Sequence, residues 1–322
     1  MKFCIIMSTY NGKQYLKEQL DSIFSQDIDA DIDCSTDNGI NTSIKIAADI
    51  TVFIRDDGST DGTVELLNEY KKSLTKGGIV VVQGQNVGSS KSFLEAIRSC
   101  PEADYYAFCD QDDVWLPKKI ATAVKQIGDT EKPILWCSDY QVTDASLNVI
   151  LPSALKQPIQ DDVRSMFYNN VPGCTMVFNW ALMQKMRMIE ISEIRMHDIM
   201  AMNVALITGE IYFEKNPFVL YRQHGDNVLG YRHKKIKVRK WIKDKMHLLR
   251  CKENYSTAEY ARAVLKALGN EMSADQKKEY QLISEMDKSF IKRLRVLTKP
   301  YTKEKFGRTS ISIRCKVLLN LM

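Results

Sequence analysis

The chain has 322 residues, of which 44% are hydrophobic and 26% charged, with a formal net charge of +5. This balance predicts a large α/β domain with an appendage, and it excludes an intrinsically disordered chain. The longest aliphatic runs are strand-sized, far short of the roughly 20 apolar residues that span a bilayer. The opening MKFCIIMSTYNG turns polar too early for a secretory signal, so we expect a cytoplasmic protein.

Charge divides the chain into two parts. Residues 1–230 carry 21 Lys and Arg against 31 Asp and Glu, a net charge of −10. Residues 231–322 carry 24 against 9, a net charge of +15. We therefore predict a catalytic domain over 1–230 and a basic region over 231–322.

Short apolar strands alternate with segments of helical period through the first 230 residues. The expected strands are FCIIM, TVFIR, GIVVVQ, YYAFCD and PILWCSDYQV. This alternation predicts a mostly parallel sheet between helices. Residues 27–50, rich in Asp, Ser, Thr and Asn, interrupt it, and we interpret them as an inserted loop or excursion and not as a metal site.

The pattern becomes helical and basic after residue 230. Apolar residues at helical spacing between 232 and 252, with Trp241 among them, predict an amphipathic basic helix. Two further helices are expected over 256–268 and 274–297.

Polar motifs follow four of the expected strands. They are STYNG (8–12), RDDGSTDGT (55–63), GQNVGSSKS (84–92) and DQDDVW (110–115). Ligands of open α/β sheets bind outside the carboxyl ends of the strands, so we expect these motifs to form one site.

The three acids of DQDD carry the clearest chemical signal. Asp110 and Asp112, two positions apart, offer oxygen ligands for a Mg²⁺ or Mn²⁺ ion shared with a diphosphate. The alternative is that an Asp caps the helix expected near Pro117. We favour the metal for Asp110 and Asp112, and leave Asp113 open between the two roles.

The other motifs allow more than one interpretation. DDGSTDGT is typical of an Asx turn, yet an Asp there could also accept the imide N–H of a uracil or thymine. GQNVGSSKS suggests a P-loop nucleotide hydrolase, but two serines separate Gly88 from Lys91, so we keep that function only as the alternative. Lys91 could also lie near a diphosphate. Asp198 could be a helix N-terminal acid or the base that deprotonates an attacking hydroxyl.

Six segments together resemble glycosyltransferase family 2, in the branch of bacterial rhamnosyl and related sugar transferases of surface-polysaccharide assembly. They are IIMSTYNGKQYLKEQLDSIFSQ, FIRDDGSTDGT, QNVGSSKSFLEAI, YYAFCDQDDVWLPKKI, HDIMAMNVAL and PFVLYRQHGDNVLG. The resemblance covers about residues 1–230 and implies the GT-A fold, a metal-assisted mechanism and inversion at the anomeric carbon. The long segment 27–50 departs from the short link usual in the family.

The resemblance also assigns roles to single residues. It implies that Ser8, Tyr10 and Asp57 line the nucleotide base and ribose, with Asp56 beside them. With this resemblance, we also expect Asn86 and Lys91 to contact the nucleotide-sugar.

At the other end of the donor, the resemblance makes Asp112 the metal-bridging acid and Asp110 its partner near the ribose or the metal. Asp198 matches the family's general base. His224 falls where some relatives bring a histidine over the diphosphate.

The implied partners are a UDP- or dTDP-linked sugar, such as rhamnose or galactose, and a saccharide acceptor that is commonly linked to a polyprenyl diphosphate. The basic region suggests peripheral contact with an anionic membrane at its inner face. The alternative is that its helices pack on the acidic domain as a lid. Nucleic-acid binding is not expected, because the catalytic part is acidic.

Overall fold

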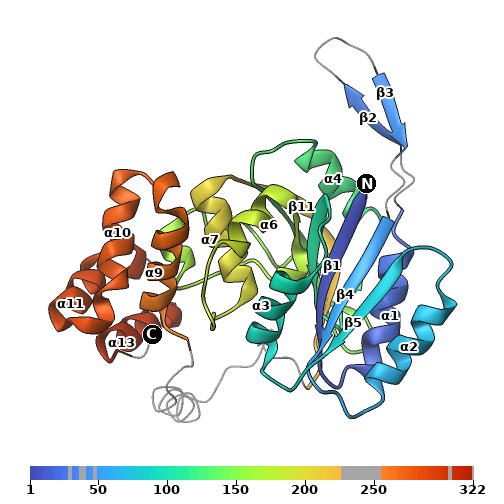
Figure 1. Cartoon of the computed structure of the whole chain (residues 1–322), viewed down its shortest axis with the longest axis horizontal. Helices are drawn as coiled ribbons and strands as arrows, with labels where there is room; N and C mark the ends of the chain where they lie inside the picture. The colour runs from blue at the N-terminus through green and yellow to red at the C-terminus, as the bar shows by residue number, and fades with distance from the viewer. Residues whose placement is uncertain (28–30, 36–40, 46–48, 226–254, 304–306, 321–322) are drawn as a thin grey trace.

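A computed structural model describes residues 1–27, 31–35, 41–45, 49–225, 255–303 and 307–320. In these residues, nine strands form one mixed sheet in the order β5-β4-β1-β6-β10-β8-β11-β7, with β9 paired to β8. Figure 1 shows β1, β4 and β5 side by side with helices to either side of them. The predicted class, a mostly parallel sheet between helices with a helical C-terminal extension, is confirmed.

Parallel and antiparallel pairs divide the sheet. The strands are β1 (Lys2–Thr9), β4 (Asp49–Asp56), β5 (Gly78–Gln83), β6 (Tyr105–Cys109), β7 (Val114–Trp115), β8 (Ile134–Thr143), β9 (Val149–Leu151), β10 (Met176–Asn179) and β11 (Glu210–Arg222). Strands β5, β4, β1 and β6 are parallel to one another, as β8 is to β11. Strand β10 runs antiparallel between β6 and β8, and β7 runs antiparallel to β11.

Helices cover both faces of the sheet. Those before residue 226 are α1 (Lys13–Phe24), α2 (Thr63–Ser73), α3 (Ser89–Ser99), α4 (Lys119–Ile127), α5 (Asp162–Ser165), α6 (Trp180–Arg187) and α7 (His197–Thr208). Alternate side chains of β1 supply the two cores: Phe3 and Ile5 belong to the cluster with α1 and α4, while Cys4 and Ile6 belong to the cluster with α3 and α7.

The segment 27–50 contains a small separate sheet. Strands β2 (Asp31–Ser35) and β3 (Asn41–Lys45) pair antiparallel in a small sheet of their own. Figure 1 shows this hairpin projecting from the body. The main sheet resumes at once, because Asp49 N donates a hydrogen bond to Met1 O at 2.9 Å.

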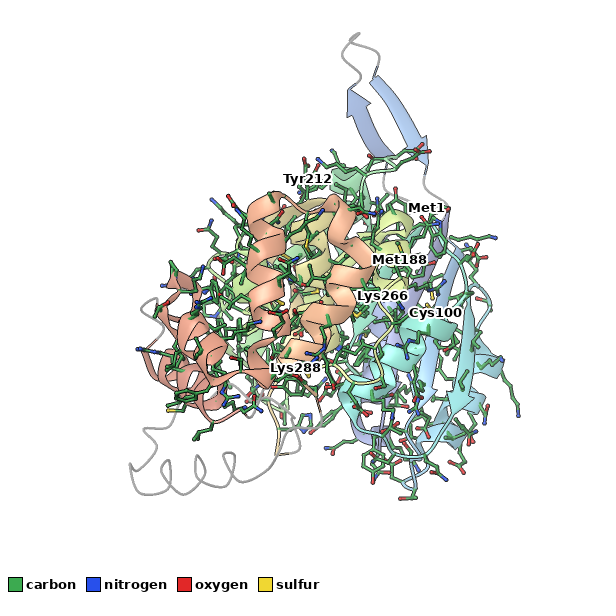
Figure 2. The ribbon with its side chains drawn as sticks, turned by 60° about the vertical axis from the view of Figure 1, so that its left-hand side comes forward. Met1, Cys100, Met188, Tyr212, Lys266 and Lys288 are labelled. Carbon is green, nitrogen blue, oxygen red and sulfur yellow. The ribbon has the colours of Figure 1, made fainter. Side chains whose placement is uncertain are left out.

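The C-terminal helices pack beside α5, α6 and α7. They are α9 (Thr257–Leu268), α10 (Ala274–Ser284), α11 (Phe290–Thr298), α12 (Pro300–Lys303) and α13 (Gly307–Leu318). Buried side chains such as Val264, Tyr280 and Ile283 belong to the same apolar cluster as α7. In Figure 2, which brings these helices forward, Lys266 of α9 is labelled; it pairs with Glu190 of the catalytic part at 2.6 Å.

Our prediction of one helix over 274–297 is wrong. Helix α10 ends at Ser284, and α11 begins at Phe290 because the Ser289 side chain accepts a hydrogen bond from Lys292 N at 3.4 Å and caps a new helix. The basic helix expected over 232–252 and the boundary at 230 lie outside the described residues.

Among the described residues, no helix combines the length and the apolar composition that crossing a bilayer requires.

Candidate active site

A cavity of about 470 Å³ lies at the carboxyl edge of the sheet, where β1, β4 and β6 end. Loops that follow these strands line it, together with the segment 169–173 and the start of α7. Its walls include the predicted residues Ser8, Tyr10, Asp57, Asn86, Asp110, Asp112 and Asp198. The motifs that follow the strands therefore meet at one edge, as parallel pairing of the strands requires.

The acid loop after β6 (residues 110–113) presents Asp110 and Asp112 to the cavity and buries Asp113. Asp113 accepts a hydrogen bond from Arg222 N at 3.0 Å. Helix α4 begins only at Lys119, with Lys118 at its N-cap position. Asp113 therefore does not cap this helix; it holds the end of strand β11.

Gln111 joins the acid loop to the loop after β1. Its side-chain oxygen accepts a hydrogen bond from Tyr10 N at 3.0 Å, and its side-chain nitrogen donates one to Tyr10 O at 3.2 Å. A Cβ on Gly12 would come within 2.2 Å of Gln111 Oε1 and displace this clamp. The clamp sets the spacing of two walls of the cavity.

His224 and Asp112 form a close pair at the cavity. His224 Nε2 lies 2.7 Å from Asp112 Oδ2, and their side chains are 11% and 15% exposed. Arg222 supports this pair. Its Nε donates a hydrogen bond to Asp112 O at 2.8 Å, and its guanidinium lies 4.5 Å from the centre of the Tyr15 ring. The His224 ring packs on the same tyrosine, with ring centroids 4.8 Å apart.

A buried lysine lies beneath the acid loop. Lys119 is 0% exposed; its Nζ donates to Cys174 O at 2.5 Å and lies 3.5 Å from the centre of the Trp115 ring. One possible ligand atom from each of Asp110, Asp113 and Cys174 lies within 4.8 Å of the other two. Lys119 is therefore a cation built into the protein beside this inner cluster, whereas Asp112 faces the cavity.

Burial shifts the pKa values of the acid loop and of the lysine beneath it. Burial, followed by the charges of Asp112 and Asp198, raises the pKa of Asp110 to about 7. Burial also raises the pKa of Asp113 well above its usual range. The pKa of Lys119 falls to about 8 because burial disfavours its charged form, although the neighbouring acids oppose the shift.

The start of helix α7 supplies a second acid to the cavity. Asp198 Oδ1 accepts a hydrogen bond from Ile199 N at 2.6 Å, and burial raises the pKa of Asp198 to about 6. His197 is buried at the wall of the same cavity, where its ring stacks on Phe93 with ring centroids 3.7 Å apart, and burial lowers its pKa to about 3. The histidine is therefore a neutral packing residue, and Asp198 is the titratable group at the cavity.

Asp57 lines the cavity but already has several partners. Its Oδ2 accepts hydrogen bonds from Val87 N and Gly88 N, both at 2.9 Å, and its Oδ1 pairs with Arg55. These contacts join the loops after β4 and β5. Ser8 contacts helix α3, which follows the second of these loops, since its Oγ donates to Ser92 Oγ at 2.7 Å.

Three predicted residues lie outside the cavity lining: Asp56, Lys91 and His224, the last of which contacts the lining residue Asp112. Asp56 is 1% exposed and closes its own turn, accepting hydrogen bonds from Thr9 Oγ1 at 3.0 Å and from Ser59 N at 2.9 Å. Lys91 Nζ lies 3.3 Å from Glu193 Oε1. Within the 84–92 motif, the amides of Val87 and Gly88 donate to Asp57, so these two groups are not directed at a phosphate.

Several lining residues were not predicted as site residues. They are Gln111, Tyr140, Asn169, Asn170, Pro172, Gly173 and Tyr221. The segment NNVPGCT carried a turn signal that could have indicated four of them, and Gln111 lies within the DQDD motif. Nothing local distinguishes Tyr140, which lies on strand β8, or the buried Lys119.

Comparison with known proteins agrees with the site. Residues 4–187, more than half of the chain, match the family model described as glycosyl transferase family 2. The chain belongs to glycosyl transferase family 2. As a family 2 member, the protein is a nucleotide-sugar-dependent glycosyltransferase.

Two sequence relatives of this family 2 protein are themselves sugar transferases by name. The dTDP-rhamnosyl transferase RfbG of Shigella flexneri is 28% identical over 240 residues, which cover 70% of this chain and 73% of RfbG. The abequosyltransferase RfbV of Salmonella typhimurium is 29% identical over 171 residues, which cover 53% of this chain and 45% of RfbV. The match thus spans less than half of RfbV.

Solved glycosyltransferase structures share the GT-A fold of this family 2 chain. The structure of S. aureus TarS 1-349 in complex with UDP-GlcNAc aligns with a TM-score of 0.51 and 13% identity, covering 100% of this chain and 90% of that one. GalNAc-T7 with UDP, GalNAc and Mn²⁺ aligns with a TM-score of 0.51 and 12% identity, covering 87% and 54%. At these identities, the likeness shows the fold alone.

Proposed function

We propose that this family 2 enzyme is an inverting, metal-dependent glycosyltransferase that moves a sugar, rhamnose or galactose or one similar, from a UDP- or dTDP-linked donor to a saccharide acceptor. The observation that carries the proposal is that Asp112 and Asp198 line one cavity at the carboxyl edge of the sheet. One acid serves the diphosphate end of the donor, and the other serves the acceptor hydroxyl. The names of RfbG and of the TarS complex support donors of this class.

The residues at the acid loop fit a divalent cation. Asp112 Oδ2 and His224 Nε2 lie 2.7 Å apart, and the carboxylate of Asp110 lines the same cavity. Carboxylate oxygen and imidazole nitrogen are ligands that Mn²⁺ accepts, and Mg²⁺ prefers the oxygens. When bound, the cation would neutralise charge on the leaving diphosphate.

We assign the nucleoside end of the donor to the loops after β1 and β5. Ser8 offers a hydroxyl, Asn86 an amide and Tyr10 a ring that is 48% exposed. Asp57 holds the loop that carries Asn86, so in our proposal it shapes this subsite as well as lining it.

In the proposed reaction, Asp198 acts as the base because its carboxylate lines the cavity. The acceptor hydroxyl gives its proton to the Asp198 carboxylate while its oxygen attacks the anomeric carbon. The new carbon–oxygen bond forms as the bond to the diphosphate oxygen breaks on the opposite face, which inverts the configuration; the electron pair leaves with the nucleoside diphosphate. A pKa of about 6 makes this carboxylate more basic than an exposed aspartate, yet ionised at neutral pH.

The proposal extends to the setting of the reaction. We expect a role in surface-polysaccharide assembly (O-antigen, capsule or lipopolysaccharide), an acceptor linked to a polyprenyl diphosphate, and a peripheral position on the inner face of the cell membrane. The net charge of +15 after residue 230 supports contact with an anionic leaflet. We retain 1–230 as the catalytic domain and 231–322 as the basic helical region.

Binding and turnover with UDP-, dTDP- and GDP-sugars, with and without Mn²⁺, test this function. We expect Asp112→Asn to lose metal-dependent donor binding. Asp198→Asn should keep donor binding and lose about 10²- to 10⁴-fold in transfer. Asp129→Asn, an exposed acid outside the cavity lining, is the matched control.

Two results would contradict parts of the proposal. Full turnover by Asp112→Asn would refute the metal assignment. ATP hydrolysis that depends on Lys91, without any nucleotide-sugar binding, would favour the alternative nucleotide hydrolase.

A further inference from the structure

Helices α11 and α13 carry a concentration of exposed apolar side chains. Five exposed large hydrophobic residues of the described chain lie between 290 and 319: Phe290 (56% exposed), Ile291 (64%), Leu294 (42%), Leu318 (40%) and Leu319 (55%). The other exposed large hydrophobic residues described are single residues or pairs in the catalytic part, such as Val149 and Ile150. Contiguous apolar surface of this kind marks a contact site.

Three of these side chains share one face of α11. At 3.6 residues per turn, Phe290, Leu294 and Ile291 fall within about 100° of one another around the helix axis. Val296 is 0% exposed and Leu297 packs against the core, so the helix is anchored by its other side. The exposed apolar side is therefore a stable feature of a packed helix.

Unpaired cations border this apolar face. Lys288 and Arg295 are exposed, and neither makes an ion pair with a described residue. Figure 2 labels Lys288 at the end of the helical bundle. Lys292, by contrast, pairs with Glu285. Residues 288–320 contain ten Lys and Arg and a single Glu, and acids of the preceding segment pair with two of these cations, Lys292 and Lys299.

We propose that the α11 face, defined as Lys288, Phe290, Ile291, Leu294 and Arg295, is the surface by which the protein binds an anionic lipid bilayer. Apolar side chains enter the boundary between head groups and acyl chains while the cations contact lipid phosphates. A second copy of the chain is a poorer occupant, because two such faces would bring like charges together. This surface specifies the peripheral membrane contact of the proposed function, and the purpose of the contact, which is to reach a lipid-linked acceptor, rests on that proposed function.

Co-sedimentation of the full chain with vesicles tests the α11 face. We expect binding to phosphatidylcholine vesicles that contain phosphatidylglycerol, and weak binding to phosphatidylcholine alone. The double variant Phe290→Ser, Ile291→Ser should bind the anionic vesicles at least about tenfold more weakly, since each buried apolar side chain contributes to partitioning. Lys288→Gln with Arg295→Gln should weaken binding and reduce its dependence on salt.

Matched controls separate the α11 face from general effects. Val149→Ser with Ile150→Ser removes an exposed apolar pair of similar exposure, 50% and 47%, on strand β9. Lys71→Gln with Lys72→Gln removes two exposed cations from α2. We expect wild-type vesicle binding from both control variants, and an unchanged melting temperature from all four variants.

Three outcomes would overturn the inference: wild-type protein that fails to bind anionic vesicles at low salt, α11 variants that bind as wild type does, or a dimer that the α11 variants convert to a monomer. The last would assign the face to a second copy. Hydrolysis of the nucleotide-sugar in the absence of vesicles is measured in parallel. This hydrolysis does not involve the α11 face. If the wild-type protein does not hydrolyse any nucleotide-sugar, the proposed function is refuted, while the inferred lipid contact is not.

Discussion

Burial raises the pKa of the acid at the start of α7. The pKa of Asp198 is raised to about 6, so its carboxyl group stays protonated to a higher pH than an exposed aspartate. A protonated carboxyl group cannot accept the proton of the acceptor hydroxyl.

We therefore expect kcat/KM to fall as the pH drops through about 6, with an acid limb that reports Asp198. The measurement is a pH–rate profile at saturating metal. An acid limb that lies at the value of an exposed aspartate, about pH 4, would contradict this assignment.

The ammonium group of Lys119 offsets part of the negative charge of the acid loop. Its ammonium is buried beside Asp110 and Asp113, held by Cys174 O and the Trp115 ring. Such a group acts on the reaction by positioning the acids and moderating their repulsion.

We expect Lys119→Met to raise the pKa of Asp110 further and to lower kcat/KM at neutral pH by about tenfold, since one pKa unit corresponds to about 1.4 kcal/mol. Stability should change less, because removing the ammonium also removes its desolvation cost. Kinetics across pH and a melting curve measure both effects. Lys118→Met, at the exposed neighbour, should behave as wild type; an unchanged pH profile in Lys119→Met would leave the lysine a purely structural role.

At the scale of elements, one carboxylate holds two loops together. Asp57 follows β4 and accepts hydrogen bonds from Val87 N and Gly88 N, just before α3. Asn86 and Gly88 of that second loop line the cavity. The connection therefore shapes the part of the cavity that we propose for the nucleoside.

We expect Asp57→Asn to raise the KM for the donor about tenfold while kcat changes little, because charge-assisted hydrogen bonds contribute about 1.5–3 kcal/mol. Asp61→Asn is the control: Asp61 belongs to the same motif and bonds to Thr63 N at 3.0 Å, but it does not line the cavity. It should lower the melting temperature without raising KM. Equal effects on KM from both variants would refute a specific role for Asp57.

At the scale of the whole molecule, the C-terminal helices brace the helix that carries Asp198. Asn203 of α7 donates a hydrogen bond from Nδ2 to Tyr280 Oη at 2.7 Å, and its Oδ1 accepts one from Tyr260 Oη at 3.0 Å. Asn203 and its surroundings are buried within the apolar cluster that both parts share. The described C-terminal helices thus continue the core of the catalytic part.

We expect a chain truncated before α9 to lose cooperative folding, because it would expose the apolar faces of α5, α6 and α7. Tyr280→Phe, a milder change, should lower the free energy of unfolding by about 1–2 kcal/mol, since a hydrogen bond to buried Asn203 is lost. Thermal unfolding followed by circular dichroism measures both variants. A truncated chain that melts near the wild-type temperature and binds donor would show that the two parts fold independently.

The local sequence pattern was sufficient to predict the parallel half of the sheet and many of the site residues. Strands β1, β4, β5 and β6 are apolar runs that neighbouring polar motifs delimit, and parallel pairing brings those motifs to one edge. Asp110 and Asp112 could be predicted as site residues for this reason, whereas Asp198, at the start of α7, was assigned from the family resemblance. Strand β11 could not, because the polar residues and proline of EKNP interrupt its apolar pattern.

Contacts between distant segments determine which of these side chains face the cavity, a point that the sequence pattern left open. Three acids in DQDD look alike along the chain, and only the contact with Arg222 on distant strand β11 turns Asp113 inward. Lys119 resembles a surface lysine of an amphipathic helix, yet Trp115 and the turn at Cys174 enclose it. The sequence was enough to predict which chemical groups gather at the edge of the sheet. Which of them face the cavity, and which are neutralised beneath it, depends on contacts between segments far apart in the chain.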